Sequence, residues 1–231
     1  MNVAIVVAAG KGTRLGGARP KQFLELRGVP VIIHTLRQFE RCQEINEVIT
    51  VLPAEDTAGF ESLTKQFELK KAGRIVSGGA TRAQSVRNGL NAIDDADIVA
   101  VQDGVRPFVT PDEIDQVVVV ARQSGAAILT APVADTIKRV YDGRIIETVA
   151  RVELRRALTP QCFRLAILKR AYEKLDELES AGLEITDDSL LVERLGFEVV
   201  TVEGSACNIK ITNAEDIGLA EAILKSVVSS Q

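Results

Sequence analysis

The sequence predicts an α/β fold with a single open, mostly parallel, Rossmann-like sheet, helices on both faces and a protruding β-hairpin arm. Short β-branched runs alternate with amphipathic stretches of helical period, which is typical of a parallel sheet built from strand and helix units. The first of these runs leads into a glycine-rich loop. The alternation breaks once, where two β-favouring runs are joined by Asp142-Gly143, a strong hairpin signal.

Length and composition predict one domain, residues 1–231, from which residues 135–151 project as an arm. No apolar run reaches the roughly 18 residues that suggest a membrane span. Residues 1–2 lead directly into the first strand, so we expect no signal peptide. Three scattered cysteines without a C-x-x-C pair fit a reducing, cytoplasmic location and exclude zinc sites of the usual spacing. The net charge of −4 argues against a general nucleic-acid binder.

The first strand is expected over residues 3–7, and the loop that follows it carries the clearest functional signal. It passes through Ala8 and Ala9 and then combines four glycines with four cations and no acidic residue, namely Gly10, Gly12, Gly16 and Gly17 with Lys11, Arg14, Arg19 and Lys21. Glycine lets backbone N–H groups approach a ligand closely, because no Cβ stands in the way. Clustered cations repel one another unless an anion lies among them, and a polyphosphate fits best. The alternative is a solvated basic loop.

Two familiar phosphate-binding loops do not match this stretch. A P-loop requires lysine and then serine or threonine after its second glycine, whereas Thr13 and Arg14 follow Gly12. The dinucleotide fingerprint requires glycine where this chain has Leu15. The motif is instead A-A-G-x-G-T-R-x(6)-K, which ends at Lys21.

The following segment contains a second glycine-rich turn. Before it we expect helices over residues 31–39 and 55–68 and strands over residues 48–52 and 74–76. The first helix holds His34, the only histidine, so the chemistry must proceed without a histidine base. Gly78-Gly79 then opens a helix with Ser85 in its first turns. Hydroxyl and N–H groups at such a start can bind a base edge or a phosphate, or simply cap the helix.

An aspartate follows the third long strand, residues 98–101. Open α/β sheets bind ligands at the carboxyl ends of their strands, which is where Asp103 lies. One carboxylate together with substrate phosphates suffices to hold Mg²⁺. The alternative is an aspartate that caps a turn. Thr110 and Glu113 then form a capping box that starts a helix, which ends at Gly125.

The last third of the chain contains the arm and returns to the sheet. Strands are expected over residues 126–131 and 198–202, and helices over residues 163–178, 186–194 and 213–228. Thr212 with Glu215 is a second candidate capping box, for the last helix. The arm carries charges on both strands, so it should project from the body instead of joining the core.

The residue types exclude most hydrolases. Neither a Ser-His-Asp set nor a Cys-His pair can be assembled from this sequence. A phosphate nucleophile, however, is already ionised at neutral pH and needs no general base. Catalysis then consists of holding two polyanions in line and neutralising charge at the α-phosphorus, for which lysine, arginine, backbone N–H groups and Mg²⁺ are sufficient.

These motifs resemble those of nucleotidyltransferases that activate sugars and polyols, and P-K-Q-F at residues 20–23 is similar to the cytidylyltransferase branch. Nearly the whole chain resembles the 2-C-methyl-D-erythritol 4-phosphate cytidylyltransferase family, through the blocks AAGKGTRLG, PKQF, GGATRAQSV, QDGVRP, APVADTIKR, ALTPQ, ITDDS and NIKIT. The resemblance implies a nucleotidyltransferase sheet, CTP and an alcohol phosphate as substrates, Mg²⁺ as cofactor, and a homodimer with arm exchange.

The resemblance also implies roles for single residues. CTP would be held by Ala8, Ala9, Gly10, Lys11 and Gly12, with Gly79 and Ser85 beside the cytidine. The catalytic set would be Arg14, Lys21, Arg151 and Lys210, in which Arg14 and Lys21 stabilise the transition state. Thr136, Arg151 and Lys210 would bind the alcohol phosphate, Asp103 and Arg106 would lie at the strand end with Asp103 near metal or ribose, and Thr159 and Thr186 would also contact substrate.

Three positions depart from the pattern of the family. Gln102 replaces a histidine, Ala150 precedes Arg151 where many members have aspartate, and Cys207 replaces an aspartate of some members. The related ribitol-5-phosphate cytidylyltransferases are the main alternative, although the P-V-x-D-T-x-K-R block favours methylerythritol phosphate. A non-catalytic nucleotide-binding regulator is a further alternative, disfavoured because Arg14, Lys21 and Asp103 are all retained.

Overall fold

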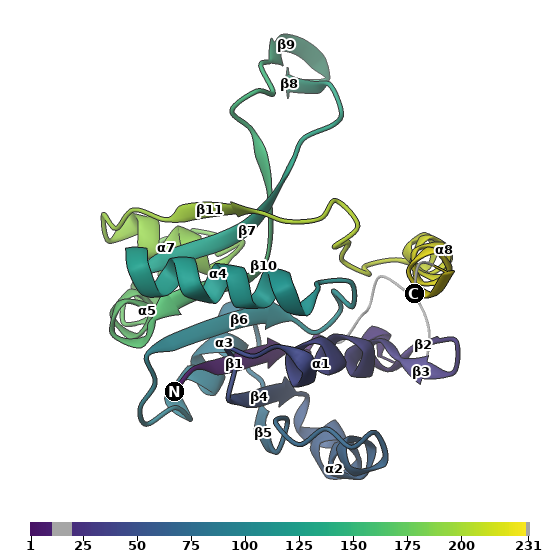
Figure 1. The fold of residues 1–231 in the computed structure, drawn as a ribbon. Helices are drawn as coiled ribbons and strands as arrows, with labels where there is room; N and C mark the ends of the chain where they lie inside the picture. The colour runs from purple at the N-terminus through teal and green to yellow at the C-terminus, as the bar shows by residue number, and fades with distance from the viewer. Residues whose placement is uncertain (11–19, 230–231) are drawn as a thin grey trace.

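The computed structural model describes residues 1–10 and 20–229, and these form an α/β fold around one seven-stranded sheet (Figure 1). The strand order is β11-β7-β10-β6-β1-β4-β5. The strands are β1 (Val3–Val7), β4 (Glu47–Leu52), β5 (Arg74–Ser77), β6 (Ile98–Asp103), β7 (Ala126–Pro132), β10 (Arg155–Arg164) and β11 (Val200–Glu203). All neighbours pair in parallel except β10, which is antiparallel to both β6 and β7. The open, mostly parallel sheet predicted from the sequence is therefore confirmed.

Helices cover both faces of this sheet. They are α1 (Val31–Arg41), α2 (Thr57–Gln66), α3 (Arg82–Asn91), α4 (Pro111–Ser124), α5 (Leu165–Tyr172), α6 (Leu175–Ser180), α7 (Asp188–Arg194) and α8 (Ala214–Ser229). Short 3-10 turns, η2 (Lys21–Phe23) and η3 (Ala54–Asp56), and a small sheet of β2 (Glu25–Leu26) and β3 (Val29–Pro30) connect them.

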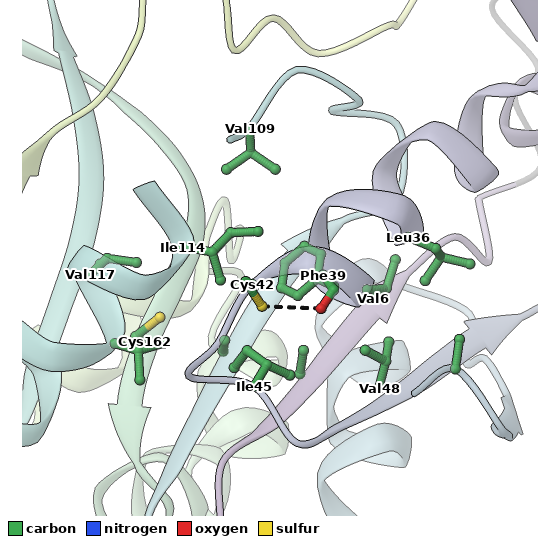
Figure 2. Close-up of a cluster of buried hydrophobic side chains, with 14 of the residues drawn as sticks. Val6, Leu36, Phe39, Cys42, Ile45, Val48, Val109, Ile114, Val117 and Cys162 are labelled. Atoms are coloured by element: carbon green, nitrogen blue, oxygen red, sulfur yellow. Dashed lines mark hydrogen bonds between the residues drawn. The ribbon is translucent and has the colours of Figure 1, made fainter. Parts of the chain in front are cut away.

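The two faces of β1 explain why its apolar residues do not alternate with polar ones. Ala4 and Val6 belong to a core cluster with residues of α1, α2 and α4. Figure 2 shows part of this cluster, in which Val6, Phe39 and Ile114 lie close together. Val3 and Ile5 belong to a second cluster with residues of α3, α5 and α7. A strand covered on both sides by helices must be apolar throughout.

The helix that starts at Thr110 has the predicted capping box. The Thr110 side chain accepts a hydrogen bond from the Glu113 N–H at 3.2 Å, and the Thr110 N–H donates to the Glu113 carboxylate at 2.8 Å. Gly125 ends α4 with a φ of 93°, a conformation that costs glycine little.

Two other helix starts differ from the prediction. Helix α3 begins at Arg82 with Thr81 as its cap, so Gly78-Gly79 precede the helix instead of opening it. At α8, Asn213 and Asp216 cap the helix in place of Thr212 and Glu215. Asn213 accepts from the Asp216 N–H at 3.0 Å, and the Asp216 carboxylate accepts from the Asn213 N–H at 2.9 Å. Asparagine and aspartate cap as well as threonine and glutamate do, so the sequence pattern fitted two adjacent registers.

The predicted helix over residues 163–178 is wrong in its first part and interrupted later. Strand β10 continues to Arg164, and α5 and α6 follow as two separate helices. Residues 158–163 are buried because β10 lies between two strands of the sheet. Pro160 lies where the pairing with β7 shifts between Ala157 and Gln161. A proline is tolerated at such an irregularity because no ladder hydrogen bond is required there.

The arm is a separate two-stranded sheet of β8 (Ile137–Tyr141) and β9 (Arg144–Val149). Asp142 and Gly143 both have positive φ, 47° and 70°, as a tight hairpin turn requires. In Figure 1 the hairpin stands clear of the seven-stranded sheet. Its apolar side chains Val140, Tyr141, Ile145 and Ile146 are exposed.

Among the described helices, none is both long and apolar enough to cross a membrane.

Candidate active site

A cavity of about 650 Å³ lies at the carboxyl ends of β1 and β6. Six separate parts of the chain contribute to its walls. They are the end of β1, the start of η2, the turn before α3, the end of β6, the loop before α7 and the loop before α8. The predicted site residues on the wall are Ala8, Ala9, Gly10, Lys21, Gly79, Ser85, Asp103, Thr186 and Lys210. Parallel strands bring these distant segments together because their carboxyl ends meet at one edge of the sheet.

A smaller pocket of about 170 Å³ adjoins this cavity and shares four lining residues with it, Arg82, Asp103, Thr186 and Lys210. Two more predicted site residues, Arg106 and Thr159, line the smaller pocket. Thr159 lies in β10, and its hydroxyl accepts a hydrogen bond from the Asp103 N–H at 3.2 Å. The two pockets together form one continuous candidate site with a wide part and a narrow part.

Asp103 is surrounded by three cations. Its Oδ1 lies 3.0 Å from Arg82 Nε, and its Oδ2 lies 2.9 Å from Lys210 Nζ and 3.4 Å from Arg106 Nε. Burial alone would raise the pKa of this carboxyl, but the charges of Arg82, Lys210 and Arg106 outweigh burial and hold the pKa far below its usual value. Asp103 therefore stays ionised at neutral pH and fixes the positions of the surrounding cations.

The surroundings of Asp103 make it a poor ligand for Mg²⁺. Both carboxylate oxygens already contact cationic side chains, which would repel a further cation. Within residues 1–10 and 20–229, no group of three histidine, cysteine, aspartate or glutamate side chains could hold a metal ion. The part of the chain that the structure describes thus offers no metal site composed of protein ligands alone.

Arg82 is a central residue that the sequence analysis did not identify. Its Nη2 lies 2.9 Å from Asp188 Oδ2, and Asp188 is fully buried and also accepts a hydrogen bond from the Tyr172 hydroxyl. Burial alone would lower the pKa of Arg82, but the charges of Asp188 and Asp103 outweigh it and raise this pKa. Arg82 therefore links Asp103 on β6 to the buried Asp188 on α7. Two features of the sequence point to Arg82, namely its positive charge shortly after the second glycine-rich turn and its place in the block GGATRAQSV.

The turn before α3 packs closely against the end of β1. A Cβ atom at Gly78 would lie 2.2 Å from the Ala9 Cβ, so only glycine fits there. The Ser85 hydroxyl accepts from the Gly79 N–H at 3.0 Å and donates to the Thr81 carbonyl at 2.9 Å. In this structure Ser85 therefore fixes the shape of the turn.

Lys21, at the start of η2, lies near the beginning of the last helix. The pKa of Asp216 is lowered, although burial acts to raise it. Hydrogen bonds from Thr212 and Asn213 lower it, and the positive charge of Lys21 contributes in the same direction. The negative charge of Asp216 therefore attracts the Lys21 ammonium, which lies between the cavity and the start of α8.

The other predicted site residues lie elsewhere. Thr136 and Arg151 are exposed on the arm and line neither pocket, and the Arg151 guanidinium donates to the Ala134 carbonyl. Lys11, Gly12 and Arg14 lie outside the described residues. Of the departures from the family pattern, buried Gln102 donates to the Arg106 carbonyl at 3.2 Å, whereas Cys207 is exposed and lines neither pocket.

Comparison with known proteins gives one consistent result. A family model described as 2-C-methyl-D-erythritol 4-phosphate cytidylyltransferase matches residues 2–226. The protein of that name from Bacillus velezensis is 45% identical over 225 residues, which are 97% of this chain and 96% of the relative. The one from Alkaliphilus metalliredigens is 44% identical over 223 residues, covering 95% of this chain and 91% of the relative.

Solved structures with the same fold carry equivalent names. The 4-diphosphocytidyl-2C-methyl-D-erythritol synthase from Anaerococcus prevotii superposes with a TM-score of 0.84 at 31% identity, covering 97% of this chain and 96% of that chain. The 2-C-methyl-D-erythritol 4-phosphate cytidylyltransferase from Thermus thermophilus superposes with a TM-score of 0.76 at 34% identity, covering 96% of this chain and 98% of that chain.

Proposed function

The chain belongs to the 2-C-methyl-D-erythritol 4-phosphate cytidylyltransferase family, and we propose that it transfers the cytidylyl group of CTP to 2-C-methyl-D-erythritol 4-phosphate. The products are 4-diphosphocytidyl-2-C-methyl-D-erythritol and pyrophosphate. The observation that carries this proposal is the convergence of Lys21, Arg82, Arg106 and Lys210 on two adjoining pockets at the carboxyl ends of the strands. Two polyanionic substrates require such a set of cations.

The reaction needs positioning and charge more than it needs a base. An oxygen of the alcohol phosphate attacks the α-phosphorus of CTP, the bond from that phosphorus to the bridging oxygen breaks, and pyrophosphate leaves. The attacking oxygen is already ionised, and among the described residues that line the pockets there is no histidine. Lys21 would neutralise charge at the α-phosphate, together with Arg14 of the glycine-rich loop.

The wide pocket suits CTP and the narrow one suits the alcohol phosphate. Ala8, Ala9, Gly10, Gly79 and Ser85 offer backbone groups and one hydroxyl in the wide part. Arg106, Thr159 and Thr186 line the narrow part. Asp103 would hold Lys210 and Arg106 in place until the substrate phosphates arrive, which supports a role for Asp103 as an internal counter-ion.

Magnesium is proposed as the cofactor, held by the phosphates of CTP. A metal that arrives with the nucleotide needs few protein ligands, because Mg²⁺ keeps several waters and binds substrate phosphates readily. Its contribution would be to neutralise charge on the triphosphate. Of the two arrangements that the sequence leaves open, a metal contact with Asp103 or a metal held by the CTP phosphates, the three cations around Asp103 favour the second.

Pyrophosphate release distinguishes the proposed function from its alternatives. We expect release with CTP and 2-C-methyl-D-erythritol 4-phosphate in Mg²⁺, little release with ribitol 5-phosphate, and none in excess EDTA. Faster release with ribitol 5-phosphate would contradict the substrate, and full activity in EDTA would contradict the metal. No release with either alcohol phosphate, despite CTP binding, would indicate the regulator.

We also propose a homodimer in which the arm completes the site of the partner subunit, in a cytoplasmic enzyme. An isolated two-stranded hairpin is only marginally stable in water, so a second subunit is a natural support. The exposed Val140, Tyr141, Ile145 and Ile146 supply apolar surface for such a contact. Thr136 and Arg151 stand on the arm away from the pockets of their own chain, and arginine binds phosphate bidentately.

Mixing two inactive variants tests the shared site. If Arg151 acts on the partner subunit, a hybrid of Arg151→Ala and Lys21→Ala chains has one site with both lesions and one with neither. We therefore expect activity to return after subunit exchange, to no more than half that of the wild-type dimer. No recovery in hybrids verified by mass would mean that each subunit uses its own Arg151.

A further inference from the structure

Helix α6 contributes one carboxylate that holds the turn before α3. Glu179 Oε1 accepts a hydrogen bond from Thr81 Oγ1 at 3.1 Å, and its Oε2 accepts from Gln84 Nε2 at 2.9 Å. These donors are 98 and 95 residues away in the sequence. Glu179 lines neither pocket, so it is outside the site described above.

The two hydrogen-bond partners of Glu179, Thr81 and Gln84, connect it to the cavity wall. The Gln84 carboxamide uses its oxygen to accept from the Ala80 N–H at 3.2 Å, while its nitrogen donates to Glu179. Thr81 Oγ1 accepts from the Gln84 N–H at 3.1 Å and donates to Glu179. The orientation of both side chains is thus fixed by a single carboxylate, which accepts from each of them.

The segment after α6 also reaches the cavity. Residues 184–186 line it, as do Gly79, Ala80 and Thr81 of the turn. The contacts of Glu179 therefore join two parts of the cavity wall that are otherwise remote in the chain. A shift of Glu179 would change the position of the turn relative to residues 184–186.

The charges along the cavity indicate which part of a nucleotide meets this turn. Lys21 and Lys210 supply the cations that a triphosphate requires. Gly79, Ala80 and Ser85 line their part of the wall without formal charge, which suits a base or a ribose, while their N–H and O–H donors hold the turn itself together. The nucleoside end of the ligand is therefore expected at the turn.

We propose that Glu179 is a positioning residue for the nucleoside part of CTP, acting through Thr81 and Gln84. This inference rests on the proposed function and assigns a nucleotide-specific role to a side chain outside the pockets. Because both hydrogen bonds of Glu179 go to Thr81 and Gln84, on the side of the site proposed for the nucleoside, its loss should affect CTP far more than the alcohol phosphate.

Steady-state kinetics with each substrate varied in turn test this role. For Glu179→Ala we expect the KM for CTP to rise about 3- to 10-fold, as for the loss of two hydrogen bonds near water, while kcat and the KM for the alcohol phosphate stay within about twofold. Glu179→Gln keeps an acceptor for one of the two donors, so its KM for CTP should lie between those of the wild type and Glu179→Ala.

A matched control lies on the same pair of helices. Asp176 of α6 pairs with Arg87 of α3 at 2.7 Å, but neither residue lines a pocket. Asp176→Ala should leave the KM for CTP unchanged. An equal rise in both variants, or a rise confined to the alcohol phosphate, would overturn the inference. If the wild type is active and Glu179→Ala keeps its KM for CTP, the inference fails alone; if the wild type releases no pyrophosphate, the proposed function fails with it.

Discussion

Replacing Lys21 by alanine is expected to lower kcat about 100- to 1000-fold, as does the loss of one preorganised donor at a developing negative charge. Lys21 stands on the cavity wall at the start of η2, and the charge of Asp216 favours its position there. The additional negative charge on the oxygens of the α-phosphate develops only in the transition state. CTP binding, which depends on the ground state, should therefore weaken much less than turnover falls.

Single-turnover rates and calorimetric CTP affinity measure the two effects separately. Lys65→Ala, which removes an exposed lysine from α2, serves as a control for the loss of one positive charge and should change neither quantity. Equal losses of rate and affinity for Lys21→Ala would show that Lys21 only binds the nucleotide. An unchanged rate would remove it from the catalytic set.

Local signals explain the parts of the fold that could be predicted from the sequence. The hairpin was predictable because Asp142-Gly143 fits a turn with two positive φ angles. The start of α4 was predictable because Thr110 and Glu113 are only three residues apart and form a capping box. In both places the physical cause lies within a few residues, so a short window of sequence contains it.

Strand β10 was missed because its cause is not local. Its residues are buried between β6 and β7. The local sequence around Pro160 contains no signal that the segment pairs with these two strands. An antiparallel strand inserted into a parallel sheet also breaks the alternation that predicted the other elements. Tertiary pairing overrode the local preference there.

The site was predictable to the extent that its motifs follow strands. Asp103 and residues 8–10 after β1 line one cavity because the carboxyl ends of parallel strands share an edge. Arg82 was missed because its partners Asp103 and Asp188 lie 21 and 106 residues away, a pairing that only the folded chain defines. Thr136 and Arg151 of the arm line neither pocket, and the role proposed for them requires the partner subunit of the proposed homodimer.

The buried pair of Arg82 and Asp188 leads to the largest expected effect on stability. Asp188→Ala should lower the free energy of unfolding by about 3–5 kcal/mol, as when one partner of a buried ion pair is removed. Asp188 is fully buried and also accepts the hydrogen bond of the Tyr172 hydroxyl, so its loss leaves two buried donors without this acceptor. At about 2–4 °C per kcal/mol, Tm should fall by roughly 6–20 °C.

The exposed pair of Arg87 and Asp176 provides the comparison for this stability effect. Asp176 is 75% exposed, so Asp176→Ala should cost less than about 1 kcal/mol. Tyr172→Phe removes only the hydroxyl donor and should cost about 1 kcal/mol. Denaturant unfolding of the three variants ranks them directly. If Asp188→Ala is no less stable than Asp176→Ala, water must replace Asp188 around Arg82, and Arg82 would then not depend on α7 for its position beside Asp103.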